Sequence, residues 1–506
     1  MVCRLCRDYV LGAFALAAFL VSLFGFAATA AARHDGRLPG TSTPKPDYVL
    51  EKRIPPGVDV FDLNFRETRR YSAARNFRVV GHSYLKGPWL TPFAREHGLG
   101  AGFNGVRVHN GIAYLAGYNS PSTLFGVLIA DVRHPRRIRP LSFIPCEPGT
   151  RCAYLRVNPE KKILVVGHDP NEANPTQPAE GQPIRAGFSF HDVSDPRNPR
   201  TLSFVETRSN GETHGFTIDD RYAYGCANVP ESRAELRGGG QEMVVIDYAD
   251  AANAQVVGSY HVQGQRVGEE FAPNDRLNPD GSQQVIQCHE VVVHQDRAYV
   301  AWRDAGMLVL DVSERTAPTL LSRLDYVPPF NGGRLGAAHT SAPVVTSEDE
   351  HPRLVVHTDE IFECPPGFGR IIDISTLSNP QVLSSYRIPA INDNYNFATG
   401  SFECPEGQQS IHLPWFDYRS PSLVHNTWYD QGVRTWDISN PFIPREVGYY
   451  ISPRYAAPGR VDRHSREVYQ DRETGLIYLT DGNGGGLTVL RWTGRIPAHP
   501  PIPGAR

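Results

Sequence analysis

Short apolar segments, four to eight residues long and separated by turn-forming residues, recur along most of the chain. They are rich in Val, Ile, Tyr and Phe and are bounded by Gly, Pro, Asn, Asp or Ser. One series within residues 213–262 reads THGFTI, RYAYGCA, MVVIDYAD and QVVGSYHV. Segments this short and this rich in β-branched and aromatic residues are typical of strands rather than helices. The pattern therefore predicts an all-β protein.

The third segment of each series has a distinctive form, in which an apolar run ends in Asp and a Pro-containing turn follows. It appears as VLIADVRHP, FSFHDVSDPRNP, MVVIDYADAANA, LVLDVSERTAP, RIIDISTLSNP and RTWDISNPFIP, with a degenerate seventh copy, GLTVLRW, around Arg491. The marker aspartates are Asp131, Asp192, Asp247, Asp311, Asp373 and Asp437. Successive markers lie about 55 to 64 residues apart, which is within or somewhat above the range of periods that indicates propellers and other repeat arrays. We interpret each unit as four antiparallel strands, which is one propeller blade.

The marker aspartates are expected to be structural. Asp at the head of a turn can bond the backbone a few residues on, and Pro fixes φ for the chain reversal. A Pro lies seven residues after the Asp in four copies, at Pro199, Pro318, Pro380 and Pro444. Because the same turn recurs in each unit, we expect no catalytic role for these aspartates.

The count of strands predicts how the ring closes. Seven third strands are present, but the last is followed by GRIPAHPPIPGAR, which is too rich in Pro to pair within a sheet. The segment ARNFRVVGHSYL, around Val79 and Val80, resembles a fourth strand that has no first three. We therefore expect residues 76–86 to complete the blade formed by residues 466–493. This closure gives one seven-bladed β-propeller without exposed edges.

The N-terminal residues predict export. Residues 1–32 carry Arg4 and Arg7, a long apolar stretch and small-residue cleavage sites, which together indicate a signal peptide; an uncleaved membrane anchor is the alternative. An N-terminal extension (33–75), the propeller (76–493) and a Pro-rich tail (494–506) follow. The expected location is periplasmic or secreted, with no membrane contact after cleavage. The net charge of −3 and the lack of a basic run speak against nucleic-acid binding.

Six cysteines follow the predicted signal peptide, and an even number in an exported protein suggests three disulfides. Cys146 and Cys152 flank a short loop. Cys364 and Cys404 lie in matching ECPPG and ECPEG loops and are expected to pair, which leaves Cys226 with Cys288 as the third pair. The sequence alone leaves this connectivity open.

Histidines gather at two positions of the repeat when the units are superposed. Four lie where first strands begin: His214, His289, His339 and His412. The ends of second strands carry His168, His357 with Asp359 and Glu360, His425, and in blade four Arg303 with Asp304. Both positions lie on one face of a propeller. The insertions 171–186, 262–287 and 390–411 are expected on that face, where they can form a lid.

Four imidazoles converging on one axis predict a site for a transition metal such as Cu, Zn or Fe, with carboxylates orienting the rings. The metal ligands would be His214, His289, His339 and His412, and the candidate catalytic residues are Glu290, Glu360 and His425. His289 and Glu290 are neighbours on a strand, so only one is expected to face the channel unless a bulge intervenes. The structural alternative is that these histidines cap turns between blades.

The phrases VLDVSERTAP, HDVSDPRNPRTLSF and TWDISNPFIPREVGYY resemble the LVIVD-repeat β-propellers, mostly exported bacterial proteins, over residues 76–493. That family is similar in architecture to the selenium-binding proteins and methanethiol oxidases, which implies a seven-bladed propeller and, for the oxidases, histidine-bound copper. Those relatives carry a Pro-His-Asn-x-His-Glu phrase entering blade six. Here the corresponding GQQSIHLPW keeps only His412.

Three hypotheses about function follow. The first is a metal-dependent enzyme, an oxidoreductase acting on a small molecule at the channel mouth. The second is a non-catalytic propeller that binds a protein partner through its top-face loops. The third is a metal-free lyase or hydrolase in which His and Glu act as acid and base.

Overall fold

The computed structural model describes residues 54–117, 123–236, 240–272, 284–325, 338–454, 456–457, 460–461 and 464–497. They belong to the unit that spans Lys45–Arg506. The predicted signal peptide and most of the Pro-rich tail lie outside the described residues. In the described part, none of the helices has the length and apolar composition needed to span a bilayer.

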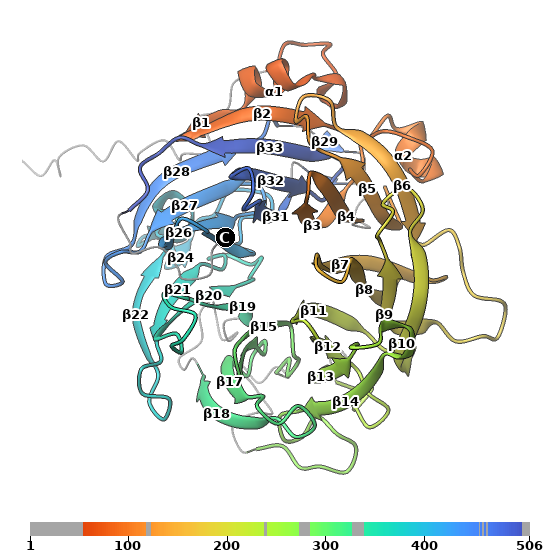
Figure 1. Cartoon of the computed structure of the whole chain (residues 1–506). Coiled ribbons are helices and arrows are strands. Elements are labelled where there is room, and N and C mark those ends of the chain that lie inside the picture. Colours follow the sequence, from red (N-terminus) through yellow and green to blue (C-terminus); the bar gives the residue numbers. More distant parts are fainter. Residues whose placement is uncertain are drawn as a thin grey trace, which may run out of the picture. The chain divides into compact units, whose positions relative to one another are not determined.

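Seven four-stranded antiparallel units surround one axis, with the first strand of each unit innermost (Figure 1). This confirms the predicted seven-bladed propeller. Blade one is β3(Phe103–His109), β4(Ile112–Gly117), β5(Gly126–Asp131) and β6(Arg139–Pro145). Blade two is β7(Thr150–Asn158), β8(Ile163–Pro170), β9(Arg185–Asp192) and β10(Arg200–Ser209). Blade three is β11(Thr213–Ile218), β12(Tyr222–Ala227), β13(Glu242–Asp247) and β14(Gln255–Tyr260).

The remaining blades repeat the same order. Blade four is β15(Glu290–His294), β16(Arg297–Ala301), β17(Met307–Asp311) and β18(Thr319–Leu324), and blade five is β19(Ala338–Pro343), β20(Leu354–Asp359), β21(Gly369–Asp373) and β22(Gln381–Tyr386). Blade six is β25(Pro414–Asp417), β26(Ser420–Thr427), β27(Val433–Asp437) and β28(Arg445–Ile451), and blade seven is β31(Ser465–Gln470), β32(Leu476–Asp481), β33(Leu487–Trp492) and the N-terminal β2(Phe77–Ser83).

The ring closes as predicted, because β2 pairs antiparallel with β33 from Phe77↔Trp492 to Ser83↔Leu487. A preceding strand, β1(Ala73–Arg75), adds a fifth strand to blade six. The segment before it carries α1(Phe65–Tyr71), whose N-terminus has a capping box. The Asn64 side chain accepts the backbone N–H of Glu67, and the Glu67 side chain accepts the backbone N–H of Asn64. Val60, Phe61 and Leu63 pack into the core of blade one, so this part of the predicted extension is built into the propeller.

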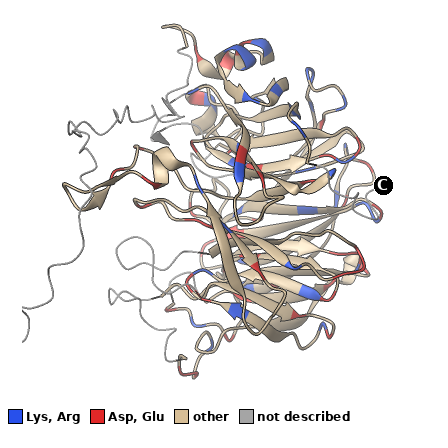
Figure 2. Cartoon of the chain, turned by 90° about the vertical axis from the view of Figure 1, so that its left-hand side faces the viewer, with Lys and Arg blue, Asp and Glu red and all other residues tan. Residues whose placement is uncertain are grey.

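Apolar side chains between neighbouring blades form the core. Clusters of buried Val, Ile, Leu and aromatic residues each draw on two adjacent sheets, as where Phe188 of β9 meets Phe216 of β11. Charged residues of both signs are interspersed along the side of the propeller (Figure 2).

The structural role of the marker aspartates is confirmed. In each of the six copies the Asp Oδ1 accepts the backbone N–H of the residue two positions on, at 2.8–3.0 Å. The side chain thereby fixes the turn between the third and fourth strands.

Three disulfides form with the predicted pairing, Cys146–Cys152, Cys226–Cys288 and Cys364–Cys404. Cys226 lies in β12 and Cys288 precedes β15, so that bond joins blades three and four directly before His289. Three disulfides indicate an oxidising environment.

We expect Asp311→Ala to lower the free energy of unfolding by about 1 kcal/mol, because it removes one hydrogen bond of the turn and leaves the Ser313 N–H without this acceptor. Asp311→Asn keeps an acceptor oxygen and should lose less. Urea unfolding followed by circular dichroism compares the two variants. Equal losses would show that the charge, rather than the hydrogen bond, stabilises the turn.

Removal of the Cys226–Cys288 bond by a double Ala substitution should destabilise the protein more than removal of Cys146–Cys152. The sequence separations are 62 and 6 residues, and the chain-entropy estimate gives a difference of about 2 kcal/mol. Denaturant midpoints of the two double variants test this order. The reverse order would mean that packing around the shorter bridge dominates.

Candidate functional site

The structure brings the four predicted ligand histidines into contact at the ring axis. His214 lies in β11 and His339 in β19, whereas His289 directly precedes β15 and His412 lies two residues before β25. The ring centroids are 3.9 Å apart for His214–His289, 4.3 Å for His289–His339 and 4.2 Å for His339–His412. His289, His339 and His412 are buried and His214 is partly buried. We call these four residues and Glu360 the histidine centre.

Hydrogen bonds to the next blade set the orientation of these rings. Nδ1 of His214 lies 3.0 Å from the carbonyl oxygen of His289, and Nδ1 of His289 lies 3.0 Å from that of His339. Nδ1 of His412 lies 2.6 Å from the carbonyl oxygen of Arg466. A carbonyl only accepts, so each Nδ1 carries the proton, and Nε2 of the neutral ring is left with a lone pair.

The inner strands carry an extra residue, which explains how consecutive side chains can both face the axis. The pairing of first and second strands shifts at this level in blades one, two, three, five and seven. In blade four the N–H of His289 bonds to the carbonyl oxygen of Ala301, which is also the register partner of Glu290. Such bulges re-aim side chains.

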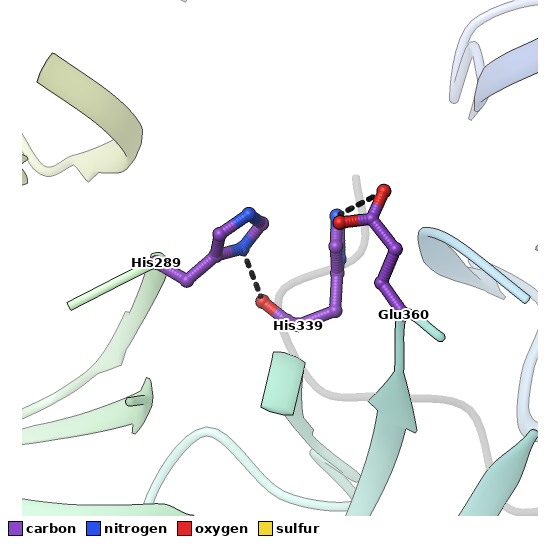
Figure 3. Close-up of side chains that lie close together, drawn as sticks. All are labelled: His289, His339 and Glu360. Atoms are coloured by element: carbon purple, nitrogen blue, oxygen red, sulfur yellow. Dashed lines mark hydrogen bonds and ion pairs between the residues drawn. The ribbon is translucent and has the colours of Figure 1, made fainter. Parts of the chain in front are cut away.

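Glu360, at the end of β20, is the carboxylate of the histidine centre. Its Oε1 lies 3.9 Å from Nε2 of both His339 and His412 (Figure 3 shows the His339 side). Arg303 Nη2 donates to Oε2 at 3.0 Å, and the hydroxyl of Tyr429 donates to Oε1. Four side chains from three successive blades therefore meet at one carboxylate.

Two of these partners, Arg303 and Tyr429, lie in turns of the same kind in two different blades. The sequences WRDAG (302–306) and WYDQG (428–432) both close with a bond from the Trp N–H to the Gly carbonyl oxygen. The second residue has positive φ in each, +40° at Arg303 and +31° at Tyr429. Non-glycine residues in this region are strained, and such strain is concentrated at functional sites. Sequence reasoning placed Arg303 here but missed Tyr429, although the repeated five-residue phrase marks both.

Further side chains that the sequence did not single out extend the arrangement. Tyr154 of β7 places its hydroxyl 3.1 Å from Nε2 of His214. Arg466 of β31 donates to the Tyr429 hydroxyl at 2.7 Å, and His464 stacks on the Tyr429 ring with centroids 4.5 Å apart. Aromatic and imidazole rings thus line the axis from blade two to blade seven.

Two of the predicted catalytic residues have their contacts elsewhere. Glu290 is buried and bonds to Arg156, one layer along the axis from the imidazoles. His425 lies in the middle of blade six, where Nδ1 contacts Thr435 Oγ1 at 2.8 Å and the ring packs on Phe77 and Trp492.

The remaining second-strand histidines also bond within their own blades. His168 contacts Ser189 at 2.7 Å, and His357 contacts Ser341 at 2.9 Å. Of the predicted second-strand groups, the structure therefore brings Glu360 and Arg303 to the histidine centre.

Electrostatics keep the imidazoles neutral and Glu360 ionised. Burial lowers the pKa of His214, His289, His339 and His412 well below the usual value, and nearby guanidinium groups add to the effect. Burial would raise the pKa of Glu360, but the guanidinium groups of Arg303 and Arg466 and the hydrogen bond from Tyr429 outweigh it and hold the pKa at about 2. Burial raises the pKa of Glu290 to about 7, which Arg156 only partly offsets.

The donor set fits a transition metal. One ligand atom from each of His289, His339 and Glu360 lies within 4.8 Å of the other two. Two nitrogens bound to one such ion at about 2.0–2.1 Å lie at most roughly 4.2 Å apart, so small rotations would suffice. Nε2 of His412 is buried, lies 3.9 Å from Glu360 and has no hydrogen-bond partner among the residues that the structure describes, which makes it a fourth available ligand.

The insertion 390–411 reaches the turn that carries Tyr429. Gln408 N–H donates to Asp430 at 2.7 Å, and Gln431 donates to Gln409 at 2.8 Å. The insertion contains α3(Pro389–Asn392) and the hairpin β23(Tyr395–Asn396) and β24(Ser401–Phe402), and Cys404 fixes it to Cys364. Residues 273–283 of the insertion 262–287 lie outside the described residues.

The family model of the LVIVD repeat matches residues 287–325 and 370–387, which cover the four strands of blade four and the last two strands of blade five. The chain is an LVIVD-repeat β-propeller. No curated protein is similar enough in sequence to this LVIVD propeller to count as a relative.

Among solved structures, the WD40 propeller domain of Doa1 is 9% identical, covers 83% of this chain and 97% of its own, and has a TM-score of 0.47. Chaetomium thermophilum Sqt1, bound to the N-terminus of ribosomal protein L10, is 12% identical, covers 78% and 98%, and has a TM-score of 0.46.

Proposed function

We propose that this LVIVD propeller is an exported metalloprotein whose histidine centre binds one transition-metal ion. The ligands would be His289, His339 and Glu360, with His412 as the fourth. The observation that carries the proposal is the orientation of the rings, because His289 and His412 each donate Nδ1–H to a carbonyl oxygen and keep Nε2 unprotonated. Metal-binding histidines are held in this way by an acceptor on the other ring nitrogen.

The chemistry of the ligands favours Cu, Zn or Fe over Mg or Ca. Neutral imidazoles suit the former ions, whereas the latter prefer mostly oxygen ligands. When bound, such an ion would supply Lewis-acid or redox chemistry in a buried site. The chain's residues would hold it, and Arg303, whose side chain is 17% exposed beside Glu360, would receive the negative end of a substrate.

We propose oxidoreduction of a small molecule as the reaction class. The third hypothesis, acid–base catalysis without a metal, has less support. An efficient general acid or base has a pKa near the working pH. At the histidine centre the pKa of Glu360 is about 2 and the pKa of each imidazole is well below its usual value, so neither is matched to proton transfer near neutrality. Glu290, whose pKa is about 7, bonds to Arg156 outside that centre.

Protein produced with Cu, Zn and Fe in the medium, and purified without a chelator or a histidine tag, should contain about one metal ion per chain by inductively coupled plasma mass spectrometry. His339→Ala should weaken binding of that ion by at least about 100-fold, since loss of a ligand exceeds the 10–100-fold effect typical of outer-sphere changes. His109→Ala, at the exposed end of β3, is the matched control. Folded wild-type protein without stoichiometric metal would contradict the proposal and leave the partner-binding hypothesis.

A subtler variant tests the orientation argument itself. Nδ1 of His339 lies 2.8 Å from the hydroxyl of Thr340. Thr340→Val removes this hydroxyl at nearly constant volume and should weaken metal binding about 10–100-fold. Unchanged affinity in a normally folded variant would show that the hydroxyl does not position the ring.

A further inference from the structure

A cavity of about 650 Å³ lies along the axis beside the histidine centre. Its wall includes Glu290, Thr340, Leu413 and Glu467. Each of them directly follows in sequence a residue that lies in or beside the histidine centre, namely His289, His339, His412 and Arg466. Inner strands of all seven blades contribute to the wall. Small-molecule sites commonly have a volume of about 300–1,000 Å³. We call it the inner-strand cavity.

Two arginine–glutamate pairs belong to the polar part of this wall. Arg156 Nη2 donates to Glu290 Oε1 at 2.9 Å, and Arg107 Nη1 donates to Glu467 Oε1 at 2.7 Å. The carboxylates are almost completely buried, whereas the arginine side chains keep 14% and 12% of their surface exposed. The exposed part of each pair is therefore the guanidinium.

Both guanidinium groups have unused donors. Arg107 uses only Nη1, toward Val106 and Glu467, and Arg156 uses one bond from each Nη, toward Leu155 and Glu290. A guanidinium has five N–H donors, so within the described residues several N–H groups of this pair are left for a ligand. Arg–carboxylate recognition is the strong, two-pronged use of such donors.

The carboxylates of the inner wall are already neutralised. Glu290 and Glu467 have their arginines, and Asp417 accepts from Arg419 and Gln470. The exception in this wall is Glu348, which is exposed to solvent. A singly charged anion at the two guanidinium groups thus meets donors whose neighbouring carboxylates are already paired, whereas a dianion would be repelled by the two glutamates behind these groups. The charge pattern favours a monoanion.

The wall also has an apolar part. Trp415, Tyr469, Leu413, Pro414 and Ala342 line it. The rings of Trp415 and Tyr469 also hold Arg107, whose guanidinium carbon lies 5.3 and 5.4 Å from their centroids. These contacts keep the donor group beside an aromatic surface.

We propose that the inner-strand cavity binds a small organic monocarboxylate with an apolar or aromatic body. The carboxylate would accept from Arg107 and Arg156, and the body would pack on Trp415, Leu413 and Ala342. This site is distinct from the histidine centre and does not depend on a bound metal.

Isothermal titration of the intact protein with benzoate, benzyl alcohol and benzylamine tests the class of ligand. Benzoate is expected to bind at least about 10-fold more tightly than the neutral and cationic analogues, the factor expected when charge-assisted hydrogen bonds are lost. Inorganic phosphate should bind more weakly than benzoate. No benzoate binding, or binding of benzylamine or phosphate at equal strength, would overturn the proposal.

Variants place the ligand in the cavity. The double substitution Arg156→Gln with Glu290→Gln removes the donor without leaving a buried charge unpaired, and should weaken benzoate binding about 10-fold. Arg445→Gln, at an exposed position of the outer strand β28 and outside this wall, is the control and should change affinity less than twofold. Ala342→Phe fills the apolar part and tests the same site if the double variant does not fold. Unchanged affinity for benzoate in either folded variant would contradict the proposal.

Treatment with EDTA separates this site from the proposed metal. Benzoate affinity should be the same in chelated and metal-loaded protein. Benzoate binding that requires metal would assign the ligand to the histidine centre and reject the inner-strand cavity.

Discussion

Closure of the ring by β2 is the constraint on which the histidine centre depends. Blade seven is complete only when the N-terminal strand pairs with β33, and this fixes blade seven against blade one. Across that seam Arg466 donates to Asn104 at 2.6 Å, and Thr480 donates to the Asn104 carbonyl oxygen. Arg466 in turn provides the carbonyl that orients His412. The two ends of the chain therefore help to set one imidazole at the axis.

The extra residue in the inner strands is the second determinant, since it produces two layers of different chemistry. A regular strand sends neighbouring side chains to opposite faces. Here His289 contacts the other imidazoles while the adjacent Glu290 bonds to Arg156 in the wall of the inner-strand cavity. Arg466 and Glu467 repeat the arrangement in blade seven. The extra residue thus allows a layer of neutral imidazoles to lie next to a layer of paired charges.

Much of the fold could be predicted from the sequence because each blade repeats the same local rule. The Asp-terminated strand, its turn and the orphan strand near Val79 depend on short-range hydrogen bonds and on strand count. The superposition of units also brought His214, His289, His339 and His412 to one place, as the ring contacts show. Their chemical role remains a prediction.

The side chains that surround those imidazoles were harder to predict. Periodicity assigns a residue to a strand end but not to a direction, so His425 and Glu360 looked equivalent in sequence. Glu360 turns to the axis, whereas His425 packs between Thr435 and Trp492. Tyr429 was not predicted because its orientation comes from a strained turn, which the pattern of apolar positions does not reveal. Direction at strand ends is set by tertiary contacts rather than by local pattern.

The charges around Glu360 bear on which metal the proposed site would hold. Arg303 and Arg466 already bring positive charge to this carboxylate, directly and through Tyr429. A hard cation, which needs several anionic oxygens, would find one shared carboxylate and two guanidinium groups. An ion held mainly by imidazole nitrogen is less dependent on negative ligands. The same guanidinium groups that disfavour Mg or Ca would then balance an anionic substrate at the metal, so the charge pattern favours one class of ion and one sign of substrate together.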